Sequence, residues 1–117
     1  MYETRDYEVK LDLRRELDSI YAVSDEQGMK IYAKILYILA CGDRVSIDMR
    51  GMSVVIPAFL NVALGQLLSI YTREQLKGRL RVSADSSTLN NVKIVLENAE
   101  QFFQNQRMSG ATALSER

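Results

Sequence analysis

Residues 44–57 read Arg-Val-Ser-Ile-Asp-Met-Arg-Gly-Met-Ser-Val-Val-Ile-Pro, and this stretch decides the fold. Apolar and polar residues alternate from Arg44 to Met49, which is the period of a half-buried β-strand. The segment Asp48-Met-Arg-Gly51 then ends the strand in a turn. Pro57 follows at a position where proline is favoured, the first turn of a helix. The stretch therefore predicts a strand that leads through a turn into a helix.

Two further strands are predicted on either side of this stretch. Residues 7–13 alternate strictly between apolar and polar residues, and Leu80-Arg-Val82 supplies a third, short strand. A short strand or turn at Ile20-Tyr21 is a further option. Helical spacing follows each of the three strands, over residues 24–40, 57–71 and about 88–104. Strands that alternate with helices indicate an α/β fold. We expect a small two- or three-layer domain with a mixed sheet of about 3–5 strands and 3–4 helices.

Capping boxes mark two of the helix starts, at Ser24-Asp-Glu-Gln27 and at Thr72-Arg-Glu-Gln75. Gly42 is expected to end the helix that Ser24 begins. The buried stripe of that helix is expected to hold Met29, Tyr32, Ala33, Leu36 and Ala40, widened by Ile31, Ile35 and Ile38. The domain is predicted to span residues 1–104, and residues 105–117 to form a disordered tail because they lack a hydrophobic period.

Composition excludes several classes of function. The chain has 117 residues, with Lys plus Arg and Asp plus Glu at 15 each, so the net charge is zero and no basic face for nucleic acid is expected. There is no histidine, which removes the commonest general base and metal ligand. The single cysteine, Cys41, forbids an intramolecular disulfide and is interpreted as a small buried hydrophobe in a cytoplasmic protein. We expect no catalytic site, no metal and no cofactor.

Residues 51–72 contain 22 consecutive residues without a charge, which is long enough to span a bilayer. Pro57, Asn61, Gly65 and Gln66 interrupt the stretch, and a strand pattern precedes it directly. We interpret it as a strand end followed by a core helix, and expect no membrane association.

The segments Val45-Ser-Ile-Asp-Met-Arg-Gly-Met52 and Val54-Val-Ile-Pro-Ala-Phe-Leu-Asn61 resemble the STAS-like domains, relatives of the bacterial anti-sigma-factor antagonists. In that family an alternating strand ends in an Asp-x-x-Gly turn, matched here by Asp48 and Gly51, and leads into a helix start that contains serine. The resemblance covers roughly residues 7–104 and implies a layered α/β fold that docks a protein. Such antagonists bind an ATPase of the histidine-kinase-like type, and phosphorylation of the helix-start serine switches the complex. Here Ala58 occupies the phosphoacceptor position, so that switch cannot operate there.

The partner-binding residues that we predict are Asp48, Arg50, Ser53, Pro57, Ala58 and Asn61. Asp48 either accepts protons or a cation, or fixes the turn through backbone amides, and the second interpretation is favoured. Arg50 is either a solvated charge or a contact to the partner. Ser53 is the hydroxyl nearest to the missing phosphoacceptor.

A second hypothesis places an anion before the last predicted helix, at Ser83, Asp85, Ser86 and Ser87. Helix N-termini favour anions. A simple N-cap at Ser86 or Ser87 explains the same residues, and the loop lacks the glycines of phosphate-binding loops.

The sequence therefore predicts a non-enzymatic interaction module of bacterial signalling that docks a histidine-kinase-like ATPase or another regulatory protein. The alternative is a sensor of an anionic metabolite or nucleotide at the carboxyl edge of the sheet. The neutral charge and the apolar helix stripes also permit a homodimer.

Overall fold

The structure is a computed structural model that describes residues 7–115, with side chains described from residue 7 to residue 108. Five strands, five α-helices and one 3-10 helix follow one another in this part of the chain. They are β1 (Glu8–Asp12), α1 (Leu13–Leu17), β2 (Tyr21–Ala22), α2 (Asp25–Ala40), β3 (Arg44–Asp48), β4 (Val54–Val55), α3 (Pro57–Ala63), η1 (Gly65–Ser69), α4 (Arg73–Leu76), β5 (Leu80–Ser83) and α5 (Ser86–Ser115).

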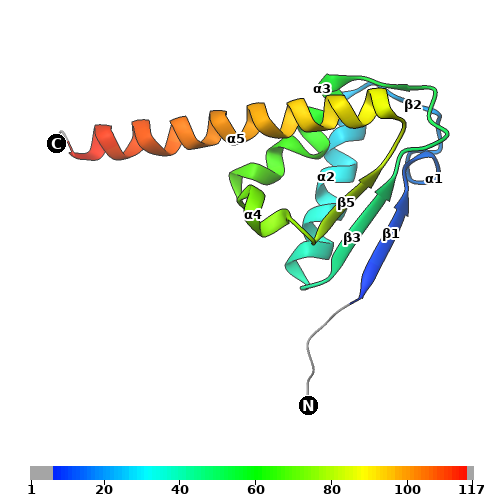
Figure 1. The fold of residues 1–117 in the computed structure, drawn as a ribbon, viewed down its shortest axis with the longest axis horizontal. Helices are drawn as coiled ribbons and strands as arrows, with labels where there is room; N and C mark the ends of the chain where they lie inside the picture. The colour runs from blue at the N-terminus through cyan, green and yellow to red at the C-terminus, as the bar shows by residue number, and fades with distance from the viewer. Residues whose placement is uncertain (1–6, 116–117) are drawn as a thin grey trace, which may run out of the picture.

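The main sheet has three parallel strands in the order β1-β3-β5, and β2 pairs with β4 in a second, two-residue parallel sheet. The expected α/β fold is confirmed, but both sheets are parallel, whereas a mixed sheet was expected. Each connection crosses through a helix, which is the route that parallel strands require. Figure 1 shows α2 and the helices that follow it on one side of the three strands.

The core lies between the sheet and these helices. The strands contribute the inward half of their alternating residues, including Leu11, Val45 and Ile47, which are buried. The outward half is polar, and Lys10, Asp12 and Arg81 are exposed. One face of the sheet is therefore covered and the other is open, so the fold has two layers.

The capping box that starts α2 is present as predicted. The Ser24 side chain accepts from the Gln27 amide, and the Gln27 side chain accepts from the Ser24 amide. Gln27 also accepts from the Val23 amide and donates to the Tyr21 carbonyl. This one side chain therefore fixes β2 to the start of α2. At the other end of α2, Gly42 has a φ of 90°, the left-handed conformation expected of a helix stop.

The buried face of α2 holds Ile31, Ile35 and Ile38, as expected, but it also holds Gly28 and Leu39, which were not expected there. Met29 is about half exposed, and Ala33 and Ala40 are exposed. Both stripes have helical spacing. The stripe with Gly28 is the buried one, because glycine has no side chain and α3 can pack directly against the backbone of α2 there.

Cys41 is exposed, so its interpretation as a buried hydrophobe is wrong. It is the C-cap of α2, and the apolar contacts at this end come from Ile38 and Leu39, which are buried. Arg79 fixes the same end of α2, because its guanidinium donates to the carbonyl oxygens of Leu39 (2.7 Å) and Asp43 (3.2 Å).

The uncharged stretch 51–72 forms β4, α3 and η1, in place of one helix from Pro57 to Tyr71. Gly65 begins η1 and lies under α5, where an added Cβ would stand 3.5 Å from the side chains of Val95 and Ala99. Glycine favours a helix break and permits this close approach. None of the helices in residues 7–115 combines the length and hydropathy needed to cross a bilayer.

The last helix is longer than expected. α5 continues to Ser115, whereas a disordered tail was expected from residue 105; residues 116–117 lie outside the described residues. No proline interrupts residues 86–115, and Arg107 ties the helix to the domain by donating to the Leu68 carbonyl at 3.2 Å. Figure 1 shows the end of α5 projecting well beyond the rest of the domain.

Candidate functional site

The turn after β3 is organised by Asp48. Its carboxylate accepts from the Arg50 amide at 2.9 Å and pairs with the Arg50 guanidinium through both oxygens, at 2.9 and 3.0 Å. Gly51 has a φ of 87°, which side chains disfavour, and the Met52 amide donates to the Met49 carbonyl. The interpretation of Asp48 as the residue that fixes the turn is therefore confirmed. Arg50 is largely exposed but is held in place by Asp48.

This ion pair controls the charge of Asp48. The side-chain hydrogen bond from Arg50, followed by the backbone hydrogen bond from Arg50, lowers the pKa of Asp48 from 3.8 to about 2. The carboxylate therefore stays ionised over the physiological range and cannot act as a general acid or base near neutral pH.

We expect acid to weaken this turn. Because the native pKa is lowered, the pair stabilises the fold above about pH 4, and the contribution disappears as the pH falls towards 2. The pair is exposed, so we expect Asp48→Asn to lower the free energy of unfolding by less than about 1 kcal/mol at pH 7. Urea denaturation should show this difference shrinking as the pH falls from about 4 through 2. A difference that is constant with pH would contradict the assignment.

The carboxyl ends of the three strands bring several polar residues together on the open face of the sheet. Asp12, Asp48 and Ser83 are register partners across β1, β3 and β5. An open cavity of about 330 Å³ covers this region. Its lining includes Asp48, Arg50 and Ser83, which the sequence singled out, and Lys10 and Arg81, which it did not. Lys10 and Arg81 occupy polar positions of the strand patterns, so the sequence contained a signal for them. Those patterns were used only to predict which strand residues are buried.

The start of α3 carries the other predicted residues. Ser53 is exposed, and its amide donates to the Ile20 carbonyl at 2.8 Å. Pro57 and Ala58 form the exposed first turn of α3, and the position that the resemblance aligned with a phosphoacceptor serine holds a methyl group. Asn61 lies one turn later, where it lines a groove between α3 and α5.

An exposed apolar patch, which the sequence did not reveal, adjoins these residues. Tyr21 and Val54 are register partners on β2 and β4 and are 50% and 39% exposed. Ile20 and Val23, on either side of β2, are also exposed. We call these four residues the β2–β4 patch. The Ile56 amide donates to the Ala22 carbonyl, which joins the patch to Pro57 and Ala58.

The proposed anion loop is occupied by a carboxylate. Asp85 caps α5 by accepting from the Thr88 amide at 2.8 Å, in place of the expected Ser86 or Ser87. The hydrogen bonds from the Thr88 amide and side chain lower the pKa of Asp85. A negative charge at the helix start repels an anion and uses one of its donors. The described contacts therefore do not favour anion binding at Ser83, Asp85, Ser86 and Ser87.

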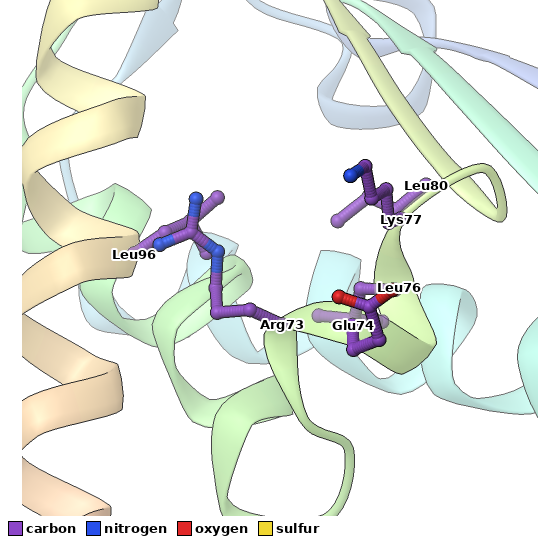
Figure 2. A pocket seen from close by; sticks show the side chains of 6 residues that line it. All are labelled: Arg73, Glu74, Leu76, Lys77, Leu80 and Leu96. Atoms are coloured by element: carbon purple, nitrogen blue, oxygen red, sulfur yellow. The ribbon is translucent and has the colours of Figure 1, made fainter.

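A separate cavity of about 380 Å³ lies between α4, the start of β5, and α5. Leu76, Leu80 and Leu96 line it, together with Arg73, Glu74 and Lys77. Figure 2 shows Arg73 beside Leu96, and Lys77 across the gap beside Leu80. Arg73 has a distant ion pair with Glu100, at 3.8 Å. Among the side chains described, no group of three or more Asp, Glu, Cys or His is placed to hold a metal ion.

The two-layer fold with its parallel main sheet, the Asp48-to-Gly51 turn and the helix that follows together define a small STAS-like domain. A family model described as "STAS-like domain of unknown function (DUF4325)" matches residues 27–90, more than half of the chain, so the chain belongs to this family. The matched segment runs from α2 to the first turns of α5 and leaves β1 outside. Comparisons with curated proteins and with solved structures gave no significant match. The resemblance to STAS-like domains is thus confirmed.

Proposed function

We propose that this domain is a non-enzymatic docking module of bacterial signalling, and that it binds a histidine-kinase-like ATPase through the β2–β4 patch and the start of α3. The observation that carries the proposal is the patch itself. Large apolar side chains that remain exposed side by side are typical of interaction sites. Here they lie next to Ser53, Pro57 and Ala58. This segment aligns with the helix start whose phosphorylation switches the complex in the anti-sigma-factor antagonists that this chain resembles.

The chemistry around the patch supports docking over catalysis. Tyr21 supplies a large apolar surface with a polar end, and tyrosine is frequent among the residues that dominate binding energy. The Asp48–Arg50 pair provides a fixed charged group nearby. Neither residue of that pair titrates near neutral pH, because the ion pair lowers the pKa of Asp48 and raises the pKa of Arg50.

Regulation of this complex would differ from that of the antagonists. Ala58 has no hydroxyl group to phosphorylate. Ser53 is exposed and lies in the same connection, so it is the hydroxyl through which a kinase-type partner would act. A phosphate there would place negative charge close to the apolar patch and would oppose docking by its desolvation cost.

The test is affinity capture of the tagged full chain from its native host, with and without ATP, followed by mass spectrometry. Tyr21→Glu is the test variant, and Tyr37→Glu is the matched control because Tyr37 is 72% exposed on α2. We expect the wild type and the control to recover a histidine-kinase-like ATPase, and Tyr21→Glu to lower its recovery at least about tenfold. Failure to recover such an ATPase, or equal recovery by all three proteins, would overturn the proposal.

A ligand-sensing module is the second candidate function. Its ligand site would be the cavity in Figure 2, which suits a ligand better than the Ser83-to-Ser87 loop does. The lining of this cavity combines three leucines with two cations, Arg73 and Lys77, and one carboxylate, Glu74. This mixture suits a small polar ligand with an apolar body that carries both a negative and a positive group. Recovery of the chain with a bound metabolite, in place of an ATPase, would support this candidate. An increase in melting temperature with that metabolite, lost in Arg73→Gln, would locate the site.

A further inference from the structure

The open face of the main sheet carries a row of two cations with a hydroxyl group between them. Parallel sheets usually have both faces covered by helices, but in residues 7–115 the helices lie on one side of the three strands (Figure 1). On the other side, Lys10 is the register partner of Ser46, and Ser46 is the register partner of Arg81. The three side chains therefore stand next to one another on β1, β3 and β5. We call them the Lys10–Ser46–Arg81 row.

The protein itself does not engage the side chains of this row. Lys10 and Arg81 are exposed, and Ser46 is partly buried between them. Within the described part of the chain, none of the three side chains takes part in a hydrogen bond or an ion pair. Because neighbouring strands are about 4.8 Å apart, the Cα atoms of Lys10 and Arg81 are separated by about 10 Å. Both side chains are long, so their charged ends can converge on one group above Ser46.

Three carboxylates lie near the row, one repeat of the strand pattern away, which is about 6.6 Å. Asp48 is neutralised by its ion pair with Arg50. Asp12 is the N-cap of α1 and accepts from a backbone amide of that helix at 3.2 Å. Glu8 is the register partner of Arg44. Among the described contacts, none of these carboxylates forms an ion pair with a cation of the row, so the row keeps its positive charge.

Cations outnumber carboxylates in this region, although the chain as a whole is neutral. The cavity of about 330 Å³ above the row adjoins a second one of about 240 Å³, with which it shares Glu8 and Arg81. The cations that line the two cavities are Lys10, Arg44, Arg50, Arg79 and Arg81. Five cations against the three carboxylates leave a net charge of +2. A surface lined mainly by one sign of charge concentrates ions of the opposite sign, so this region favours an anion.

We propose that the Lys10–Ser46–Arg81 row binds a dianionic phosphate group, as free phosphate or as the phosphoryl group of a small phosphate monoester. Two cations match the charge of the dianion. The guanidinium of Arg81 can donate two parallel hydrogen bonds to phosphate oxygens, while Lys10 and Ser46 donate to the others. A carboxylate has one charge and two oxygens, and uses this donor set less fully. This site is separate from the cavity in Figure 2, and the inference does not depend on the docking function proposed above.

Titration of the full chain, labelled with ¹⁵N, tests the proposal when inorganic phosphate and glycerol 3-phosphate are added near pH 7.5 and amide chemical shifts are followed. We expect saturable shifts centred on the row, with a dissociation constant of about 1 mM because the site is open to solvent. Acetate at the same ionic strength should bind at least about tenfold more weakly. Tighter binding of the ester would identify a monoester as the ligand, and tighter binding of inorganic phosphate would identify free phosphate.

Variants of the two cations test whether the row is the site. Arg81→Gln and Lys10→Gln should each raise the dissociation constant at least about fivefold, because each removes a charge-assisted donor. Lys93→Gln is the matched control, since it removes the same charge from an exposed position on α5. It should change the dissociation constant by less than about twofold, because distant exposed charges are screened.

A substitution between the cations gives an independent test. Ser46→Asp should abolish phosphate binding, because a carboxylate of the protein itself would then lie between Lys10 and Arg81. Ser46→Asn has a similar size without the charge and should keep the dissociation constant within about threefold of the wild type. Unchanged amide shifts in the rest of the spectrum show that the variants are folded. No saturable shift in the wild type up to about 50 mM phosphate, equal effects of Arg81→Gln and Lys93→Gln, or normal binding by Ser46→Asp would overturn the proposal.

Discussion

Phe59→Ala should lower the free energy of unfolding by about 3–5 kcal/mol. Phe59 is the largest of the fully buried side chains in the described part of the chain. It lies in α3, and the core around it comes from α2, the sheet and α5. Removing the ring loses its transfer free energy and leaves a cavity that the rigid helix pair cannot close. Since domains of this size have only about 5–15 kcal/mol in total, a large part of the stability would be lost.

Urea denaturation followed by circular dichroism measures this loss. Phe102→Ala is the control, because Phe102 is 54% exposed on α5 and should cost less than about 1 kcal/mol. If Phe59→Ala does not fold, Phe59→Leu keeps the test usable, with an expected loss of about 1–2 kcal/mol. Equal losses for Phe59→Ala and Phe102→Ala would mean that the core is not centred on α3.

Gly28→Ala should be destabilising although alanine is the better helix former. Glycine inside a helix costs about 1 kcal/mol relative to alanine, so propensity alone predicts a gain of stability. However, a Cβ at residue 28 would stand 2.7 Å from the Val62 Cβ and 3.2 Å from the Phe59 carbonyl oxygen. Neither atom is the end of a flexible side chain, so α2 and α3 must move apart. We expect a net loss of about 1–3 kcal/mol.

The sign of the change distinguishes packing from propensity. Ala33→Gly, at an exposed position of the same helix, should cost about 1 kcal/mol and reports propensity alone. Val62→Ala should not rescue Gly28→Ala, because the closest contact is with the Cβ itself. Val62→Gly, which removes that Cβ, should restore part of the stability that Gly28→Ala loses. A Gly28→Ala protein more stable than the wild type would show that α2 and α3 do not pack as closely as described.

Local sequence patterns were sufficient for the elements with strong local signals. The alternation in residues 7–13 and 44–49 gave β1 and β3, and the two capping boxes gave the starts of α2 and α4. Asp48 was recognised as the residue that fixes its turn because an Asx turn needs only neighbouring atoms. Each of these features depends on residues within a few positions of one another.

The missed features required knowledge of distant segments. β4 has two residues and exists because β2 pairs with it, so no local period marks it. The exposed side chains of Tyr21 and Val54 lie side by side because of the same strand pairing. The end of the helix that was expected to reach Tyr71 depends on α5 lying over Gly65. The three isoleucines of α2 were expected to be buried and are, but Met29, Ala33 and Ala40 have a similar spacing, so the sequence did not exclude them from the buried face.

By itself, the sequence determined the α/β class, the turn after β3, the helix starts and the lack of a hydroxyl group at residue 58. These depend on side-chain chemistry and short-range hydrogen bonds, which a sequence states directly. Only the tertiary structure decided which face of α2 is buried, which strand residues meet on the open sheet face, and which apolar side chains stay exposed. The physical reason is that burial depends on segments far apart in the chain, and hydrophobic attraction has no direction of its own that local spacing could reveal.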